Sequence, residues 1–420
     1  MFMNVLIFGL GLHNGGFNAA LYYARRNYKV IVTDIKAEKE FGDRINSLTA
    51  LGVTLHLGGH LEEDFLWADI IIKNPAITPN NQFLTLNQHI TTDIIELLSF
   101  LKGNKRCHII GISGTKGKSS TTHMISHVLK ESGALVFMGG NIGVSGFSLI
   151  EEIECCEGNT DFFVVLELSS WQIRDMAFYS VDVMFQATII TSLYPDHGDY
   201  YQDIASYYDE KLGLFSFASK NRYMSLQAKQ ALKDSIIAIP SGVNYIRVED
   251  LIKAPLLPIG IDKEVIERAM FSYKGLSHRQ EVVATINSII WINDSSATIP
   301  EAMNYTLNTL DIPYILIFGG SDKKCNIEVS LIFIQKASHL ILLDGSFTRS
   351  KIIPFLIEKS IMFSGPYFSM KEAVKEAYYC ANKKEKPITV VLSPGAASFG
   401  PFVNSDERGN IFKECVLQLS

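Results

Sequence analysis

The chain has 420 residues, which is long for one ordinary domain and suggests two or three. It is 47% hydrophobic and 20% charged, so each domain can bury a core. The formal net charge of −6 argues against a nucleic-acid groove as the main binding surface. Six cysteines without CxxC or zinc-site spacing are typical of reduced thiols in a cytosolic protein.

The N-terminal stretch MFMNVLIFGLGLHNGG is apolar, but it lacks the basic segment and the cleavage site of a signal peptide. It predicts a buried strand that enters a glycine turn. No apolar run reaches the roughly 18 residues that a membrane span requires. We therefore expect a cytoplasmic protein without membrane contact, and we expect it to act as a monomer.

Short apolar runs alternate with longer helical stretches along the chain. In chain order, the predicted strands are VLIFGLG, YKVIVTDI, ADIIIKN, CHIIGIS, DFFVVLEL, VMFQATIITS, PYILIFGG, HLILLDG and ITVVLSPG. Continuous apolar strands between helices are typical of parallel sheets covered on both faces, with ligands at the carboxyl ends of the strands. The sequence predicts an α/β fold of three domains: a Rossmann-like domain over 1–103, a P-loop domain over 104–275 and a second Rossmann-like domain over 276–420.

The stretch GISGTKGKSS has the layout of a P-loop, because it lies between a predicted strand and a predicted helix. Backbone N–H groups at such a helix N-terminus attract phosphate, Lys118 could reach the outer phosphates, and Ser119 or Ser120 could hold Mg²⁺. The spacing departs from the strict form, since the glycines fall at Gly111 and Gly114. The alternative is a glycine turn with a surface lysine, but the flanking strand and helix favour a nucleoside triphosphate site.

Two strand ends downstream carry candidate metal ligands. Glu167 ends a predicted strand where a P-loop protein often places a magnesium ligand, although a lone surface glutamate is the alternative. Asp196, His197 and Asp199 cluster in the next turn, where they could bind Mg²⁺ or cap a helix. Lys211 lies on the helix that follows, and the local sequence gives it no role beyond a solvated helix face.

Together these stretches resemble the Mur ligase family of ATP-dependent ligases, which build the peptidoglycan stem peptide. The segments GTKGKSS, GGNIG, LELSSWQ, YPDHGD, GLSHRQE, WINDSSAT, FGGSDKK and LSPGAASFGPFVNSDERG follow in the family's order over nearly the whole chain. LELSS, INDS and the last segment most resemble the members that add glutamate to UDP-N-acetylmuramoyl-alanine. The resemblance implies an ADP-forming enzyme that converts a carboxylate into an acyl phosphate, with Mg²⁺, in two ions, as its cofactor.

The resemblance also implies roles for individual residues. The ATP-binding residues would be Gly114, Thr115, Gly117, Lys118, Ser119, Ser120, Arg279 and Asp294. The catalytic residues would be Lys118, His197 and Lys211, and the magnesium ligands would be Ser119, Glu167, His197 and a carbamylated Lys211. A carbamate turns a lysine cation into an anion, which explains a lysine beside metal ions.

The UDP-linked substrate and the incoming glutamate have their own expected residues. Around UDP the resemblance implies Leu12, His13, Asp34 and Lys36, and at the muramoyl peptide it implies Asn141, Ser169 and Gln172. The glutamate would contact Thr298, Lys323 and Ser398, although an exposed loop lysine is the alternative for Lys323. The stretch GLGLHNGG is also similar to the dinucleotide fingerprint, but its third glycine is displaced by one, which disfavours NAD.

Four features depart from the family pattern. The segment between Lys211 and Gly275 is short and lacks the motif whose asparagine helps hold adenine. Ser296 replaces a usual lysine, Ser405 replaces an aromatic residue of the commoner form, and Lys116 replaces an asparagine. Such features resemble a branch that adds L-glutamate. We predict D-glutamate, the commoner substrate, and L-glutamate stays the alternative.

Two other functions are open on the sequence. Folylpolyglutamate synthetases share the P-loop chemistry but lack a UDP-binding domain, whereas about 100 residues of α/β pattern precede the loop here. A catalytically degraded relative that serves as a binding protein is the second alternative. Against it stand the residues that catalysis would need, all present: Lys118, Glu167, His197, Lys211, Arg279 and Asp294. A measurement of ATP turnover distinguishes an active ligase from a degraded binding protein.

Overall fold

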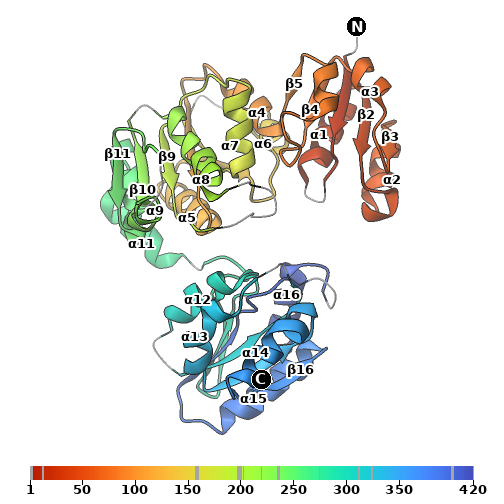
Figure 1. Ribbon diagram of the computed structural model, residues 1–420. Coiled ribbons are helices and arrows are strands. Elements are labelled where there is room, and N and C mark those ends of the chain that lie inside the picture. Colours follow the sequence, from red (N-terminus) through yellow and green to blue (C-terminus); the bar gives the residue numbers. More distant parts are fainter. Residues whose placement is uncertain are drawn as a thin grey trace. The chain divides into compact units, whose positions relative to one another are not determined.

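The computed structural model describes residues 3–11, 14–156, 160–195, 201, 203–218, 220–233, 237–273, 275–310, 313–322, 325–398 and 402–419. The chain divides into two compact units, Met1–Tyr273 and Lys274–Ser420. The first unit carries two β-sheets and the second carries one (Figure 1). The predicted α/β fold with parallel sheets is confirmed, and every predicted apolar run contains a strand.

The first sheet belongs to the N-terminal part of the chain, coloured red to orange in Figure 1. Its strands run in parallel in the order β3-β2-β1-β4-β5. The strands are β1 (Asn4–Phe8), β2 (Lys29–Asp34), β3 (Thr54–Leu57), β4 (Ile70–Lys73) and β5 (Ile90–Thr91). The helices are α1 (Asn14–Arg25), α2 (Arg44–Thr49), α3 (Glu62–Trp67) and α4 (Asp93–Leu101). The strand order reverses at β1, which in such sheets opens a crevice at the carboxyl ends of the strands.

The second sheet is also parallel, in the order β11-β10-β9-β6-β8-β7. Its strands are β6 (Cys107–Ser113), β7 (Leu135–Gly140), β8 (Phe162–Glu167), β9 (Ala187–Ile190), β10 (Arg222–Ser225) and β11 (Val243–Ile246). The helices are α5 (Lys118–Glu131), α6 (Gly146–Glu154), α7 (Ser170–Phe178), α8 (Ile204–Leu212), α9 (Leu226–Ala231), α10 (Lys253–Leu256) and α11 (Lys263–Ser272). The apolar runs that predicted strands are buried on both faces here, as parallel sheets require.

The first two sheets share one hydrophobic core. The ring of Tyr22 on α1 packs 4.8 Å from the ring of Phe147 on α6. At the rim of this contact, Arg26 pairs with Glu151 at 3.2 Å and with Glu154 at 2.7 Å. This shared core explains why the two sheets form one compact unit.

The third sheet lies in the second unit and has the order β12-β13-β17-β14-β15-β16. Its strands are β12 (Glu281–Ile286), β13 (Ile289–Asn293), β14 (Tyr314–Phe318), β15 (His339–Leu343), β16 (Ser364–Tyr367) and β17 (Ile388–Leu392). The helices are α12 (Pro300–Asn308), α13 (Leu331–Lys336), α14 (Ile353–Glu358), α15 (Met370–Asn382) and α16 (Ser405–Leu417). All neighbouring strands are parallel except β12 and β13, which form a hairpin.

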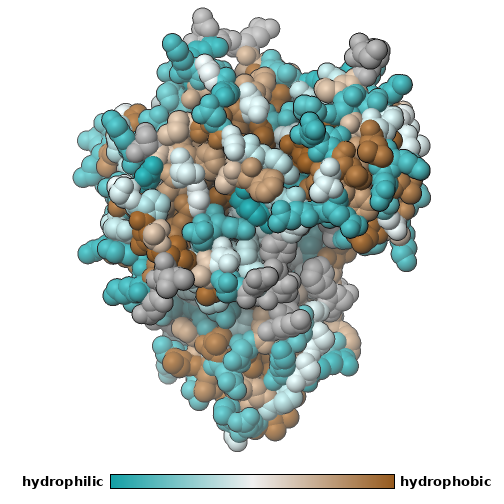
Figure 2. All heavy atoms as spheres, turned by 45° about the horizontal axis from the view of Figure 1, so that its top comes forward, coloured by the Kyte–Doolittle hydropathy of each residue, from teal (hydrophilic) through white to brown (hydrophobic). Residues whose placement is uncertain are grey.

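The surface mixes polar and apolar side chains. Figure 2 shows hydrophilic residues in teal spread between brown apolar ones over the visible face. Among the described ranges, no helix combines the length and the apolar character that crossing a bilayer requires.

Candidate active site

The P-loop connects β6 to α5 in the middle of the second sheet. Gly117 has a φ of 82°, and α5 begins at the next residue, Lys118, so the unpaired N–H groups of the first helical turn border the loop. Gly114 has a φ of 141°, and a Cβ atom there would lie 2.2 Å from Oγ1 of Thr191. The Thr191 hydroxyl donates to the Lys116 carbonyl at 2.6 Å. The loop is therefore held in one anion-binding conformation that only glycine permits at these positions.

The predicted ATP-binding residues of this loop lie together. Lys118 Nζ donates to the Thr115 carbonyl at 3.0 Å, so its ammonium lies over the loop. The Thr115 hydroxyl accepts from the backbone N–H of Tyr194 at 3.1 Å. Ser119 is half-buried and Ser120 is exposed in the first turn of α5. Of the two hydroxyls, Ser119 is the better sheltered for a metal ion.

Glu167 ends β8 beside Ile112 of β6, and it is only 2% exposed. The alternative of a lone surface glutamate is therefore wrong. Oε1 accepts a hydrogen bond from Nδ2 of Asn141 at 2.8 Å, while Oε2 is buried without a partner among the described residues. A buried carboxylate oxygen with no donor is costly unless a cation meets it. This donor set suits Mg²⁺, which prefers carboxylate oxygen.

Lys211 lies on α8 and is also only 2% exposed, so the alternative of a solvated helix face is wrong. Its Nζ donates to the carbonyl of Gly114 at 3.1 Å and lies 4.6 Å from the ring centre of Tyr207. The structure thus brings Lys211 to the P-loop across almost a hundred residues of sequence. Its carbamylation stays a prediction.

Some predicted residues fall outside the described ranges, and their roles stay predictions. These residues are Leu12, His13, Asp196, His197, Asp199 and Lys323.

A cavity of about 480 Å³ lies between the carboxyl ends of the first two sheets. The predicted substrate residues that the structure describes in this unit all line it: Asp34, Lys36, Asn141, Ser169 and Gln172. The Asp34 carboxylate shapes the wall, because it accepts hydrogen bonds from the backbone N–H groups of Gly11 at 3.1 Å and Lys36 at 2.9 Å. Residues predicted from distant motifs thus form one cavity.

Helix N-termini converge on this cavity. It is lined by Gly15 and Gly16 of α1, by Asp93 of α4, and by the caps of α6 and α7, Ser145 and Ser169. Ser169 forms a capping box with Gln172, which fixes both side chains. Helix N-termini carry partial positive charge, so the cavity favours an anionic ligand.

The sequence analysis missed part of the cavity wall. The loop Asn74–Ile77 follows β4, and His60 follows β3. Asn74 could have been found, because it is the last residue of the predicted strand ADIIIKN and so falls at the edge of the sheet where ligands gather. His60 had no such signal, because the sequence analysis did not predict β3.

In the second unit, Asp294 follows β13 and is buried. Burial disfavours its charge and raises the pKa of the carboxyl to about 6. Oδ2 accepts from the hydroxyls of Thr306 at 2.6 Å and Ser393 at 2.7 Å, and Oδ1 accepts from the N–H of Gln280 at 3.3 Å. Arg279, which is exposed, precedes Gln280 and lowers the Asp294 pKa slightly by its charge. The two predicted nucleotide contacts are thus neighbours.

Two of the residues predicted to bind the glutamate substrate lie within the described ranges, on adjoining loops of the third sheet. Thr298 is half-buried after β13, and Ser398 is buried after β17. The loops are bonded together, since the N–H of Gly395 donates to the carbonyl of Ala297 at 2.8 Å. The loop after β14 joins them through a bridge between Ser321 and Ala397. These loops share the carboxyl edge of the sheet, where a ligand is expected.

Within the described residues, one group of three side chains could share a metal ion: His339, Glu376 and Cys380. Ser364 already bonds to Nε2 of His339 at 2.8 Å and to Oε1 of Glu376 at 3.2 Å. The hydrogen bonds account for this group without an ion, and it lies apart from the predicted site residues.

Comparison with known proteins adds relatives over the full length. A family model described as the Mur ligase middle domain matches residues 112–246. A protein of Borreliella burgdorferi named UDP-N-acetylmuramoylalanine–D-glutamate ligase is 31% identical over 465 aligned positions, covering 99% of this chain and 98% of that protein. Proteins of the same name are 29% identical in Clostridium tetani, covering 99% and 96%, and 27% identical in a Roseiflexus species, covering 98% and 97%.

Solved structures share the fold at low identity. The UDP-N-acetylmuramate–alanine ligase of Thermotoga maritima matches with a TM-score of 0.59 and 16% identity over 100% of both chains. A MurF ligase of Thermotoga maritima in complex with ADP has a TM-score of 0.56 at 12% identity, covering 93% of this chain and 96% of its own. A bifunctional folylpolyglutamate synthase/dihydrofolate synthase has a TM-score of 0.52 at 16% identity and covers only 77% of this chain and 93% of its own.

Proposed function

The chain belongs to the Mur ligase family, and we propose that it is the ATP-dependent, ADP-forming ligase that adds D-glutamate to UDP-N-acetylmuramoyl-L-alanine in peptidoglycan precursor synthesis. One observation carries the proposal. Asn141 lines the substrate cavity and also donates to Glu167, the buried carboxylate beside the P-loop strand. A ligand in the cavity would therefore end next to the place where ATP phosphates are expected.

The cavity suits a long anionic substrate with two different ends. The glycine turn and the N-terminus of α1 provide backbone N–H groups for a diphosphate, and Asp34 and Lys36 lie where a nucleoside would meet the sheet edge. At the other end, Asn141, Ser169 and Gln172 offer amide and hydroxyl groups for a muramoyl peptide. We assign Leu12 and His13 to the UDP end by the family resemblance.

The chemistry starts from a carboxylate, which is a poor electrophile until one oxygen becomes part of a phosphate leaving group. Lys118 offsets the charge of the ATP phosphates as the alanine carboxylate attacks the terminal phosphorus, giving an acyl phosphate and ADP. The amino group of glutamate then attacks the acyl carbon, and inorganic phosphate leaves. The water-poor setting of Glu167 and Lys211 strengthens the electrostatic effect of each charge.

Magnesium fits the residues at this site. Glu167 provides a carboxylate oxygen that has no partner among the described residues, and we assign Ser119, His197 and a carbamylated Lys211 as further ligands by the family resemblance. When bound, Mg²⁺ would neutralise the repulsion between the carboxylate and the phosphates.

In the second unit we propose that Arg279 and Asp294 contact the nucleotide and that Thr298, Lys323 and Ser398 bind glutamate. The adjoining loops that carry Thr298 and Ser398 support this assignment. Lysine and serine suit a carboxylate, since they provide charge-assisted and neutral hydrogen bonds. D-glutamate is favoured because the curated relatives are named for it, while Ser296 and Ser405 keep L-glutamate as the alternative.

We further propose that residues 1–103 bind UDP, 104–275 bind ATP and 276–420 bind the amino acid and part of the nucleotide. The protein would work as a monomer in the cytoplasm, where ATP and UDP-linked precursors are found.

The test is a ligation assay with ATP, Mg²⁺, UDP-N-acetylmuramoyl-L-alanine and either D- or L-glutamate, read by phosphate release and product mass. We expect product with D-glutamate only, and none with Lys118→Ala. Product with L-glutamate only would reverse the stereochemical assignment. No turnover with either isomer, while ATP still binds, would support a degraded binding protein instead.

A further inference from the structure

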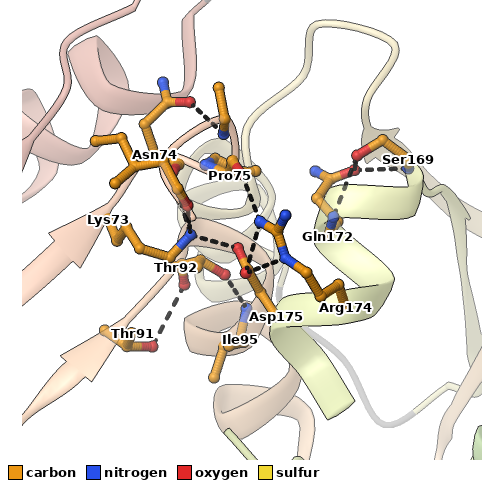
Figure 3. Close-up of polar contacts among 12 residues, drawn as sticks. Lys73, Asn74, Pro75, Thr91, Thr92, Ile95, Ser169, Gln172, Arg174 and Asp175 are labelled. Carbon is orange, nitrogen blue, oxygen red and sulfur yellow. Dashed lines mark hydrogen bonds and ion pairs between the residues drawn. The ribbon is translucent and has the colours of Figure 1, made fainter. Parts of the chain in front are cut away.

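A buried ion pair joins the first two sheets at the wall of the substrate cavity, which Lys73 itself lines. Lys73 is the last residue of β4, and Asp175 lies on α7. Both side chains are fully buried, and Lys73 Nζ lies 2.6 Å from Oδ2 of Asp175 (Figure 3). The pair links positions 102 residues apart in the sequence.

The cations of this network also hold one loop by its carbonyl groups. Lys73 Nζ donates to the carbonyls of Ile77 at 2.7 Å and Asn74 at 3.2 Å, so its three donors are all used. Arg174, on α7, donates from Nη2 to the carbonyl of Pro75 at 3.0 Å and to Oδ1 of Asp175 at 3.2 Å (Figure 3). The carboxylate of Asp175 therefore accepts hydrogen bonds from both Lys73 and Arg174, the two cations that bind the carbonyl groups of the loop.

The anchored loop and the anchoring helix form two walls of the cavity. Residues Asn74–Ile77 line it from the first sheet, while Ser169 and Gln172, at the start of α7, line it from the second. Asn74 packs closely on the glycine turn, since a Cβ atom on Gly9 would lie 2.9 Å from its Cβ. A shift of Asp175 would therefore move the loop relative to Ser169 and Gln172.

Stability alone does not explain a fully buried ion pair. Removing two charges from water is costly, and replacing such a pair with packed apolar residues is often neutral or stabilising. Removing one partner alone is destabilising, because the other charge stays buried without compensation. A geometric role at a ligand cavity gives this pair a function that apolar residues could not supply.

We propose that Lys73 and Asp175 are positioning residues. They hold the loop Asn74–Ile77 and the start of α7, the two walls of the cavity, in fixed relative positions and so set the affinity for the UDP-linked substrate. The identity of that substrate rests on the proposed function. Neither residue needs to touch the reacting atoms. Arg174 contributes to the same positioning, because it donates a hydrogen bond to the carbonyl of Pro75.

The test compares three variants by calorimetric binding of UDP-N-acetylmuramoyl-L-alanine without ATP, together with KM for ATP and the melting temperature. Lys73→Met combined with Asp175→Leu removes both charges and keeps an apolar core. Arg174→Met keeps the Lys73–Asp175 pair and removes the Pro75 contact together with the hydrogen bonds from Arg174 to Asp175. Because both members of the buried pair remain, this variant should fold even if the double variant does not. The matched control is Arg26→Met, which breaks the two partly exposed ion pairs of Arg26 with Glu151 and Glu154, between the same two sheets and outside the cavity lining.

We expect the Kd for the UDP-linked substrate to rise about tenfold or more in the double variant and by a smaller factor in Arg174→Met, with KM for ATP unchanged. Arg26→Met should bind like the wild type. Unchanged substrate affinity in folded Arg174→Met and in the double variant would overturn the inference. Equal losses for ATP and for the UDP-linked substrate would also overturn it, because they indicate general destabilisation. A wild type that does not bind this substrate would contradict the proposed function itself.

Discussion

Nδ2 of Asn141 donates a hydrogen bond of 2.8 Å to Oε1 of Glu167, and this bond joins the substrate cavity to the buried carboxylate beside the P-loop. Asn141 follows β7 and Glu167 ends the neighbouring strand β8, so the two meet at the carboxyl edge of the second sheet. The other carboxylate oxygen, Oε2 of Glu167, is buried and has no hydrogen-bond partner in the part of the chain that the structure describes. A ligand that contacts Asn141 in the cavity is therefore linked, through this hydrogen bond, to the carboxylate of Glu167 beside the P-loop.

Glu167→Gln should lower kcat by about 10²-fold or more while the protein keeps its fold. The amide is nearly isosteric, but it loses the negative charge that would hold a metal ion. Steady-state kinetics over a range of Mg²⁺ concentrations would measure this, and the variant should require much more Mg²⁺. Normal kcat and normal Mg²⁺ dependence would show that Glu167 is not a metal ligand.

Gly114→Ala should weaken ATP binding strongly. The added Cβ would lie 2.2 Å from Oγ1 of Thr191 and 2.9 Å from the backbone nitrogen of Ser192, so the loop must deform. Gly59→Ala is the matched control, because a Cβ atom there meets nothing within 4 Å. Calorimetric titration with ATP compares the two, and equal ATP affinity would mean that the loop tolerates the methyl group.

Asp294 should make the second unit less stable as pH rises. Its folded-state pKa of about 6 lies above the ordinary value of 3.8, so the folded state binds more protons between these values. The free energy of unfolding should therefore fall as pH rises through this window, by up to about 3 kcal/mol above it. Asp294→Asn removes this titration.

The variant should gain stability relative to the wild type as the pH is raised from 4 to 7. Denaturant unfolding of both proteins across this range measures the difference. A difference that does not change with pH would contradict the raised pKa.

Activity should depend on dissolved carbon dioxide, if Lys211 carries a carbamate. A carbamate forms reversibly from a neutral amine and carbon dioxide, with release of a proton. Assays in degassed buffer should show reduced kcat, and bicarbonate should restore it. Lys211→Met should be inactive under both conditions, and a wild type insensitive to bicarbonate would exclude a carbamate that exchanges during the assay.

The strands with long apolar runs could be predicted from the sequence, because burial on both faces leaves a direct signal. The strand β16, with the sequence SGPY, could not, since glycine and proline disfavour strands and this one forms by pairing with β15. The β12–β13 hairpin was also missed. Its turn residues, Asn287 and Ser288, have φ values of 51° and 60°, and such turns are more often marked by an Asn-Gly pair.

The site was predictable where a motif carries its chemistry locally. Asp34 and Asn141 belong to such motifs, and both line the cavity. Asn74 and Ile77 line it as well, but they are placed by the contact of Lys73 with Asp175. A contact between residues so far apart in the chain leaves no local signal. The end of the predicted strand indicates Asn74, but the position of the whole loop against α7 appears only in the folded structure.

In the proposed reaction, ATP activates the alanine carboxylate of a UDP-linked substrate bound in the cavity. The most direct measurement uses UDP-N-acetylmuramoyl-L-alanine labelled with oxygen-18 in that carboxylate, followed by mass analysis of the released phosphate. One labelled oxygen should appear in inorganic phosphate for each peptide bond formed. Unlabelled phosphate, released while product forms, would contradict the acyl-phosphate mechanism.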